Sequence, residues 1–243
     1  MVLNYVLLGI IQGIFEWIPV SSEGITALFS SFLVKDINAI DIALFLHLGT
    51  ALAAFVFFRK EWKKVLILKD KKMFNFLLIV TFVSLIVSYP LLKFIKSVAL
   101  GNGLLLITGV GLLMTSYLLK KDKMINKGSV LLVGFLQGLS VIPGLSRSGS
   151  TIFGLSLFKK DPKEILTISY MMSVPVGIIA SFYMLITEPN LVTFGWIGLV
   201  TSFLVGILSL HLLLKLANKI NFSKFTLFFG LICLIGSLIG FLI

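Results

Sequence analysis

The sequence Pro143-Gly-Leu-Ser-Arg147-Ser-Gly-Ser-Thr151 decides how this chain folds, because it interrupts an otherwise apolar segment, residues 131–158. A fixed positive charge at membrane depth costs roughly 2.5–3.5 kcal/mol. Proline and glycine also break a helix there, and lipid cannot satisfy the freed backbone groups. An arginine among hydroxyls on broken backbone therefore indicates a cavity that holds an oxyanion, since the guanidinium fork matches phosphate or carboxylate. The alternative, an extramembrane loop, is disfavoured by the apolar runs on both sides.

The composition is that of a polytopic membrane protein. Of the 243 residues, 58% are apolar, and the mean hydropathy is +1.10, far above a soluble domain. The single cysteine, Cys233, excludes an intrachain disulfide and a cysteine-cluster metal site. The formal charge of +11 does not indicate nucleic acid, because the lysines gather at the ends of apolar runs, where topology alone requires them. The first apolar run lacks a basic start, so we expect no cleavable signal peptide.

A second interrupted apolar segment begins the chain. Residues 1–15 are apolar but too short to span a membrane, a break follows at residues 16–24, and another short run ends at residue 34. Two short apolar runs around a Pro/Gly/Ser break are typical of a re-entrant helix pair. Six other apolar runs predict membrane spans, at residues 40–58, 73–92, 104–119, 165–186, 192–214 and 225–243.

The two halves of the chain match at polar and glycine positions. Six residues in the first half recur 125 positions later: Gly9, Gln12, Gly13, Ser21, Gly24 and Thr26 precede Gly134, Gln137, Gly138, Ser146, Gly149 and Thr151. Each half holds one re-entrant pair and three spans, and because three is odd the second half enters the membrane inverted. Inverted repeats of this kind place their site at the repeat interface near the midplane. We therefore predict an all-α polytopic membrane protein with six spans. It is a single domain, residues 1–243, of two inverted repeats, about 1–121 and about 126–243.

Loop charge predicts the orientation. Four segments on one face, residues 59–72, 120–127, 159–163 and 215–224, hold 17 of the 21 lysines and arginines. The positive-inside rule makes that face cytoplasmic. Both termini of this multi-pass cell (plasma) membrane protein then lie outside, and the two re-entrant pairs enter from opposite sides. The sequence leaves the oligomeric state open, a homodimer included.

Glu16 is the first candidate for chemistry. Gln12 lies four residues earlier, so both side chains share one face of a short helix. Facing Arg147 across the repeat axis, Glu16 can act as a general base, orient a hydroxyl or hold a divalent cation. The alternative is a buried salt bridge to Arg147 without chemistry.

The hydroxyl groups form a second set of candidates. Each alone is most often a helix cap, but together they can donate to phosphate oxygens, and one can be a nucleophile if a base lies beside it. A helix that starts near Gly149 would aim free amide groups at an anion. The set comprises Ser21, Ser22, Ser146, Ser148 and Thr151.

Two further polar residues leave two interpretations open. His47, in the middle of a span, is either functional or a hydrogen-bonding residue between repeats. Glu23 is either a site carboxylate or, as we favour, a negative charge at a helix start.

Both interrupted segments resemble one known family, the undecaprenyl-diphosphate phosphatases linked to bacitracin resistance. Gln12-Gly-Ile-Phe-Glu-Trp-Ile-Pro-Val-Ser-Ser-Glu-Gly24 resembles the family signature (E/Q)-G-x-x-E-(F/W)-x-P-V-S-S-x-G-H. Residues 143–151 are similar to its second signature, P-G-x-S-R-S-x-x-T. The two motifs occur in the family's order, and the resemblance covers essentially the whole chain.

The resemblance implies a six-span enzyme that hydrolyses a C55 isoprenyl diphosphate to the monophosphate and inorganic phosphate, recycling the lipid carrier of cell-envelope glycan synthesis. It assigns the family's acidic residue to Glu16, its paired serines to Ser21 and Ser22, and its arginine to Arg147. It also implies help from a divalent cation, Mg²⁺ or Ca²⁺, with Glu16 as the candidate ligand. The partners it implies are the polyprenyl diphosphate and membrane lipids, and no nucleic acid.

Two positions depart from the family pattern. Gln12 stands where many members have glutamate, which removes one metal ligand, and Ile25 stands where the family usually has histidine. The second departure counts against a histidine nucleophile from that position, and we hypothesise that His47 takes its place.

We expect Ser22 to be the nucleophile, activated by Glu16, with direct attack by water as the alternative. Arg147 stabilises the developing charge, and the remaining residues bind substrate: Gln12, Ser21, Ser146, Ser148, Thr151 and His47. A polyprenyl-phosphate flippase using the same midplane site and a catalytically inactive lipid-binding scaffold are the rival functions.

Overall fold

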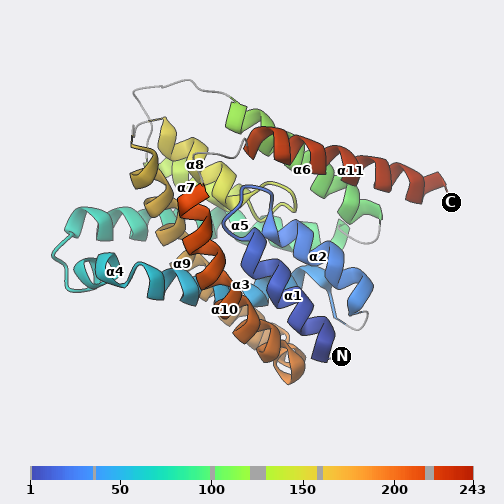
Figure 1. Cartoon of the computed structure of the whole chain (residues 1–243), viewed down its shortest axis with the longest axis horizontal. Coiled ribbons are helices and arrows are strands. Elements are labelled where there is room, and N and C mark those ends of the chain that lie inside the picture. The colour runs from blue at the N-terminus through green and yellow to red at the C-terminus, as the bar shows by residue number, and fades with distance from the viewer. Residues whose placement is uncertain are drawn as a thin grey trace.

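The computed structural model describes residues 2–34, 37–98, 102–120, 130–157, 161–216 and 222–242, and within them the chain is helical with no strand. The helices (Figure 1) are α1 (Val2–Phe15), α2 (Ser22–Leu33), α3 (Ala39–Phe57), α4 (Arg59–Leu66), α5 (Lys71–Val98), α6 (Asn102–Lys120), α7 (Val130–Leu139), α8 (Arg147–Ser156), α9 (Pro162–Thr187), α10 (Val192–Leu216) and α11 (Phe222–Leu242), with a 3₁₀ turn η1 (Pro189–Leu191). The expected basic connectors at residues 120–127, 159–163 and 215–224 lie partly outside the described residues.

Four of the described helices are long and apolar enough to cross a membrane, namely α3, α5, α9 and α10. Their outward faces are apolar, as the exposed side chains of Phe82 on α5 and of Leu204 and Leu208 on α10 illustrate. Such faces are stable against lipid and not against water. The prediction of an all-helical, multi-pass membrane protein is confirmed.

Helices α3 and α9 form the centre of the molecule and pack against each other. Ser181 of α9 donates from its hydroxyl to the carbonyl oxygen of Leu44 on α3, at 3.0 Å. Around them, α10 lies between α1 and α3, and α5 lies between α7 and α9. Helices α6 and α11 run side by side along one edge (Figure 1). The centre is therefore built equally from the two halves of the chain.

The glycines that match between the halves have the same packing role. A Cβ on Gly13 of α1 would lie 2.8 Å from Cβ of Val205 on α10. A Cβ on Gly138 of α7 would lie 2.6 Å from Cβ of Val87 on α5. Both distances are shorter than any side chain allows, so a residue without a Cβ lets each short helix lie directly against its long neighbour.

The two helix breaks meet at the centre. The first, residues 16–21, separates α1 from α2, and the second, residues 140–146, separates α7 from α8. The Ser21 hydroxyl accepts from the backbone N–H of Gly24, at 3.2 Å, and from that of Gly144, at 2.9 Å. Gly144 has φ +93°, a conformation that favours glycine. One hydroxyl thus caps α2 and joins the two breaks.

The structure differs from the predicted boundaries at two places. Helix α5 does not end near residue 92 but continues through Pro90 to Val98. Lys93 is accommodated there because its Nζ lies 4.6 Å from the centroid of the Tyr89 ring, one turn earlier. The basic segment after α3 is also not a plain connector: it contains α4, which buries Trp62 and Val65. The apolar side of α4 joins a core cluster with α5 and α9 that no charge pattern indicates.

Candidate active site

Glu16 lies at the junction of the two halves and is 4% exposed. Its Oε1 forms an ion pair with Nη2 of Arg147. Its Oε2 accepts from Nε2 of Gln12, at 2.7 Å, and from the Ser22 hydroxyl, at 2.6 Å. Both carboxylate oxygens are therefore engaged, which leaves Glu16 better placed to accept a proton from Ser22 than to hold a cation.

Arg147 is the first residue of α8, directly after the N-cap Ser146. While Nη2 contacts Glu16, Nη1 donates to the carbonyl oxygen of Ser169 on α9, at 3.1 Å. The guanidinium is thus held between the first break and α9, and it lines both cavities described below. A positive charge fixed in this way needs little reorganisation to meet an anion.

His47 of α3 also approaches the glutamate, with Nε2 3.3 Å from Oε2 of Glu16. Its Nδ1 lies 2.7 Å from the carbonyl oxygen of Ala43. That oxygen can only accept, so Nδ1 donates to it, and Nε2 is the ring nitrogen that faces the carboxylate. The hypothesis that His47 lies near the site therefore agrees with the geometry. Ile25, by contrast, packs in an apolar cluster with Leu112 and Cys233.

The structure separates the predicted hydroxyls into two groups. Four of them line a small polar cavity, namely Ser21, Ser22, Ser146 and Ser148. Thr151 lies behind it instead, donating to the carbonyl oxygen of Arg147 at 2.8 Å. Gln12 likewise lies behind Glu16, and its side-chain oxygen Oε1 accepts from the Thr26 hydroxyl at 3.0 Å. Thr151 and Gln12 therefore position the residues that face the cavity, rather than facing it themselves.

The helix expected to start near Gly149 is α8, which begins two residues earlier, at Arg147. The Ser146 hydroxyl accepts from the backbone N–H of Gly149, at 3.2 Å, as an N-cap. The same hydroxyl lies 3.1 Å from that of Ser148. The Ser146 hydroxyl therefore caps the N–H of Gly149 itself, and the anion-binding role of this helix start stays a prediction.

The polar cavity adjoins a larger, more apolar one. Apolar side chains of α3, α5 and α9 form much of its wall, Leu44, Leu85 and Met184 among them. Five residues line both cavities: Glu16, Glu23, His47, Ser140 and Arg147. A charged head group and an apolar tail can thus be bound by connected spaces.

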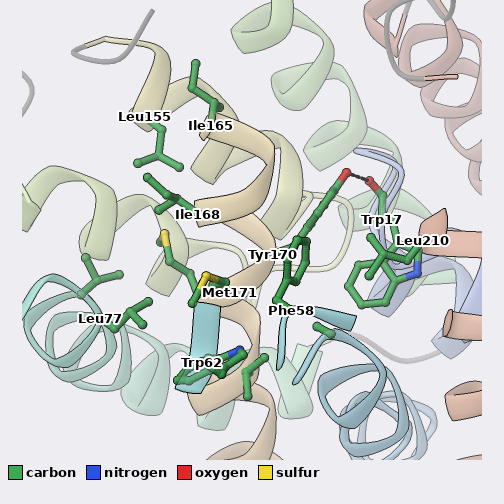
Figure 2. Packing of buried hydrophobic residues seen from close by; sticks show 14 of the residues in the cluster. Trp17, Phe58, Trp62, Leu77, Leu155, Ile165, Ile168, Tyr170, Met171 and Leu210 are labelled. Atoms are coloured by element: carbon green, nitrogen blue, oxygen red, sulfur yellow. Dashed lines mark hydrogen bonds between the residues drawn. The ribbon is translucent and has the colours of Figure 1, made fainter. Parts of the chain in front are cut away.

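Two aromatic residues brace this arrangement (Figure 2). The Tyr170 hydroxyl donates to the carbonyl oxygen of Trp17, at 2.9 Å, and their rings meet edge to face with centroids 5.4 Å apart. Trp17 in turn donates from Nε1 to the carbonyl oxygen of Gly206 on α10, at 3.0 Å. Trp17 directly follows Glu16 and Tyr170 directly follows Ser169, and Glu16 and Ser169 are the two residues that accept from Arg147. The aromatic contacts therefore hold both partners of Arg147 in place.

Sequence patterns did not identify Ser169 or Tyr170 as part of the site. Their only signal is a pair of neighbouring hydroxyls near the start of an apolar span. Gln137 lines the larger cavity and had been noted only as the repeat partner of Gln12. Among the described residues, no group of three or more His, Cys, Asp or Glu is arranged to hold a metal ion.

Comparison with known proteins now identifies the family. Residues 5–236 match the model of the bacitracin resistance protein BacA family. A protein of Methanococcoides burtonii named undecaprenyl-diphosphatase is 34% identical, with 93% of this chain and 95% of that protein covered. A protein of the same name from Methanococcus vannielii is 36% identical, with 96% of each chain covered. Another from Haloarcula marismortui is 31% identical, with 98% of each covered. The chain therefore belongs to the bacitracin resistance protein BacA family.

Proposed function

We propose that this protein is a membrane phosphatase that hydrolyses undecaprenyl diphosphate, or a closely related polyprenyl diphosphate, to the monophosphate and inorganic phosphate. The observation that carries the proposal is the contact between Ser22 and Glu16, a hydroxyl donating to a carboxylate at 2.6 Å beside Arg147. This is the arrangement of a nucleophile with its base, next to a cation for a developing negative charge. The name undecaprenyl-diphosphatase shared by the relatives described above supports the same substrate.

In the first step, Ser22 Oγ attacks the terminal phosphorus and its proton passes to Glu16 Oε2. The bond from that phosphorus to the bridging oxygen breaks, and Glu16 returns the proton to the departing prenyl monophosphate. In the second step, Glu16 takes a proton from water as the water attacks the phosphoserine. The phosphorus–Oγ bond breaks, Ser22 regains its proton and inorganic phosphate leaves.

Direct attack by water, with Glu16 as the base and Ser22 as an orienting hydroxyl, is the alternative mechanism. Both mechanisms place the same charge on the transferred phosphoryl group, which Arg147 and the cavity hydroxyls of Ser146 and Ser148 are placed to stabilise. Such positioning and electrostatic stabilisation carry most phosphoryl-transfer catalysis. A divalent cation would add charge neutralisation of the diphosphate oxygens when bound.

The apolar part of the larger cavity suits the isoprenyl tail. Leu85 of α5 lines this cavity and also an apolar groove between α4, α5 and α9, whose wall includes Phe82 and Pro175. A tail that leaves the head-group cavity past Leu85 would continue along α5 without exposing its apolar surface to water.

The proposed membrane architecture has six spans, with α6 and α11 crossing in addition to the four long helices. In it, α1–α2 and α7–α8 are re-entrant pairs of two inverted repeats, and both termini lie outside the plasma membrane. The close packing of Gly13 of α1 against α10 and of Gly138 of α7 against α5 supports the repeat. The basic residues of α4, on the face expected to be cytoplasmic, support the orientation.

The test is release of inorganic phosphate from a C55 isoprenyl diphosphate by the detergent-purified protein, with and without EDTA. Arg147→Ala should lower the rate at least about 100-fold, the usual effect of removing one such donor. A loss below about tenfold would contradict the assignment of the site.

A flippase is the rival function, because inverted repeats with a midplane site are also transporter architecture. The shared name of the relatives favours hydrolysis. Folded protein that releases no phosphate but moves a labelled polyprenyl phosphate across vesicles would replace the proposed function with transport.

A further inference from the structure

Glu23 is a buried carboxylate for which the mechanism above has no use. It is 7% exposed and lies in the first turn of α2, directly after Ser22. Its side chain lines both the polar cavity and the larger one. Its Oε1 is buried and accepts no hydrogen bond from the described residues. A buried carboxylate left in this way is costly unless it takes up a proton or a cationic partner arrives from outside.

The charges in the cavity indicate which kind of ligand would pair with Glu23. The guanidinium of Arg147 is already paired with Glu16, so that pair contributes no net charge. A diphosphate would bring at least two further negative charges next to the carboxylate of Glu23. An ionised Glu23 and a diphosphate that share one low-dielectric cavity would repel each other strongly. A small cation between Glu23 and the diphosphate would remove both problems at once.

A second side chain of the larger cavity has polar atoms without a hydrogen-bond partner among the described residues. Gln137 of α7 is 3% exposed, and neither its Oε1 nor its Nε2 has a hydrogen-bond partner among the described residues. Its side chain lines the larger cavity together with Glu23 and Ser140. Amide and hydroxyl oxygens are ligands of hard divalent cations, and the free amide N–H₂ can donate to a phosphate oxygen.

We propose that Glu23 is the protein carboxylate that holds a divalent cation, Mg²⁺ or Ca²⁺, against the diphosphate of the substrate, and that Gln137 completes this subsite. A cation held by one carboxylate, substrate phosphates and water is the arrangement that Mg²⁺ most often adopts in proteins. Glu16, whose two oxygens are engaged by Arg147, Gln12 and Ser22, is then the base and not the metal ligand. The inference rests on the proposed function, because the diphosphate supplies the remaining ligands.

The experiment measures Mn²⁺ binding to the detergent-purified protein by the loss of the free Mn²⁺ electron paramagnetic resonance signal. It is done with a non-hydrolysable prenyl methylenediphosphonate present, which replaces the bridging oxygen by CH₂. Glu23→Gln should weaken Mn²⁺ binding about tenfold or more, the size usual when a group supporting a metal is lost. Gln137→Met, which keeps the volume and removes the amide, should weaken it in the same direction. Glu61→Gln, on the exposed face of α4, is the matched control and should bind as the original protein does.

Mn²⁺ affinity within about twofold of the original protein in folded Glu23→Gln would overturn the inference. If Glu23→Gln does not fold, Glu23→Asp and Gln137→Met decide: the first should retain cation binding and the second should lose it, and the reverse result would overturn the inference. Phosphate release that persists unchanged in EDTA would also overturn it. An original protein that binds Mn²⁺ through Glu23 but releases no phosphate from the lipid would instead contradict the proposed function alone.

Discussion

The hydroxyl of Ser21, in the first helix break, accepts a hydrogen bond from the backbone N–H of Gly144 in the second, at 2.9 Å. This contact joins residues 123 positions apart, and it lies directly beside Ser22 on one chain segment and three residues before Arg147 on the other. Ser22 and Arg147, the proposed nucleophile and the proposed partner of the phosphoryl group, therefore come from separate halves and are held next to each other by Ser21.

Gly144→Ala should disrupt this register. The position has φ +93°, and a Cβ there would overlap the carbonyl oxygen of Thr108. We expect the free energy of unfolding to fall by about 1–3 kcal/mol or more, measured as a lower Tm in detergent. Gly236→Ala is the control, because the nearest atom to its Cβ would be 3.9 Å away. Equal Tm values for the two variants would show that the break tolerates a side chain.

Ser22→Ala distinguishes the two mechanisms. If Ser22 is the nucleophile, turnover falls at least about 100-fold, and acid-quenched reactions of the original protein with substrate labelled in the terminal phosphate contain protein-bound label. Ser21→Ala is the neighbouring control, which should lower stability yet leave that label. Substantial turnover by Ser22→Ala without any trapped phosphoprotein would establish direct attack by water.

His47→Ala tests whether the imidazole assists Glu16. Because Nε2 lies 3.3 Å from Oε2 of the glutamate, we expect kcat to fall about 100-fold, the lower end for loss of an acid–base group. His211→Ala, at the other histidine of the chain, should leave kcat unchanged, since its ring lies beside Phe57. Near-normal turnover by His47→Ala would end the hypothesis that this histidine replaces the one expected at position 25.

Leu85→Trp tests the path of the tail. The larger side chain would obstruct the passage between the head-group cavity and the groove along α5. We expect kcat/KM to fall about tenfold or more for a C55 diphosphate, from lost apolar burial, and less for a C15 diphosphate. Phe82→Trp, farther along the groove, should have a smaller effect on both substrates. Equal losses for long and short substrates would place the tail elsewhere.

Much of the site could be predicted from local sequence. Hydroxyls, glycines, prolines and one arginine inside apolar runs are so costly in lipid that their positions indicate broken helices and an anion site. Glu16, Ser22, Ser148 and Arg147 were predicted in this way, and the structure brings them to one cavity or to its wall.

The rest depended on contacts between distant segments. The continuation of α5 through Pro90, the formation of α4 and the anchoring of Arg147 by Ser169 all follow from packing partners far away in the chain. Helix propensity and hydropathy are local quantities and carry no such information.

By itself, the sequence determined a polytopic helical membrane protein with two interrupted apolar segments, and it predicted that the arginine in one of them binds an anion. The reason is that an unpaired backbone group or a charge is costly in lipid wherever it stands, so its position in the sequence is informative. Only the tertiary structure decided what each polar residue does. Thr151 and Gln12 lie behind the cavity, both oxygens of Glu16 have partners, and Oε1 of Glu23 has none among the described residues. The physical reason is that a hydrogen bond is satisfied by whichever partner lies within about 3 Å, and partners from opposite halves of the chain meet only when the protein is folded.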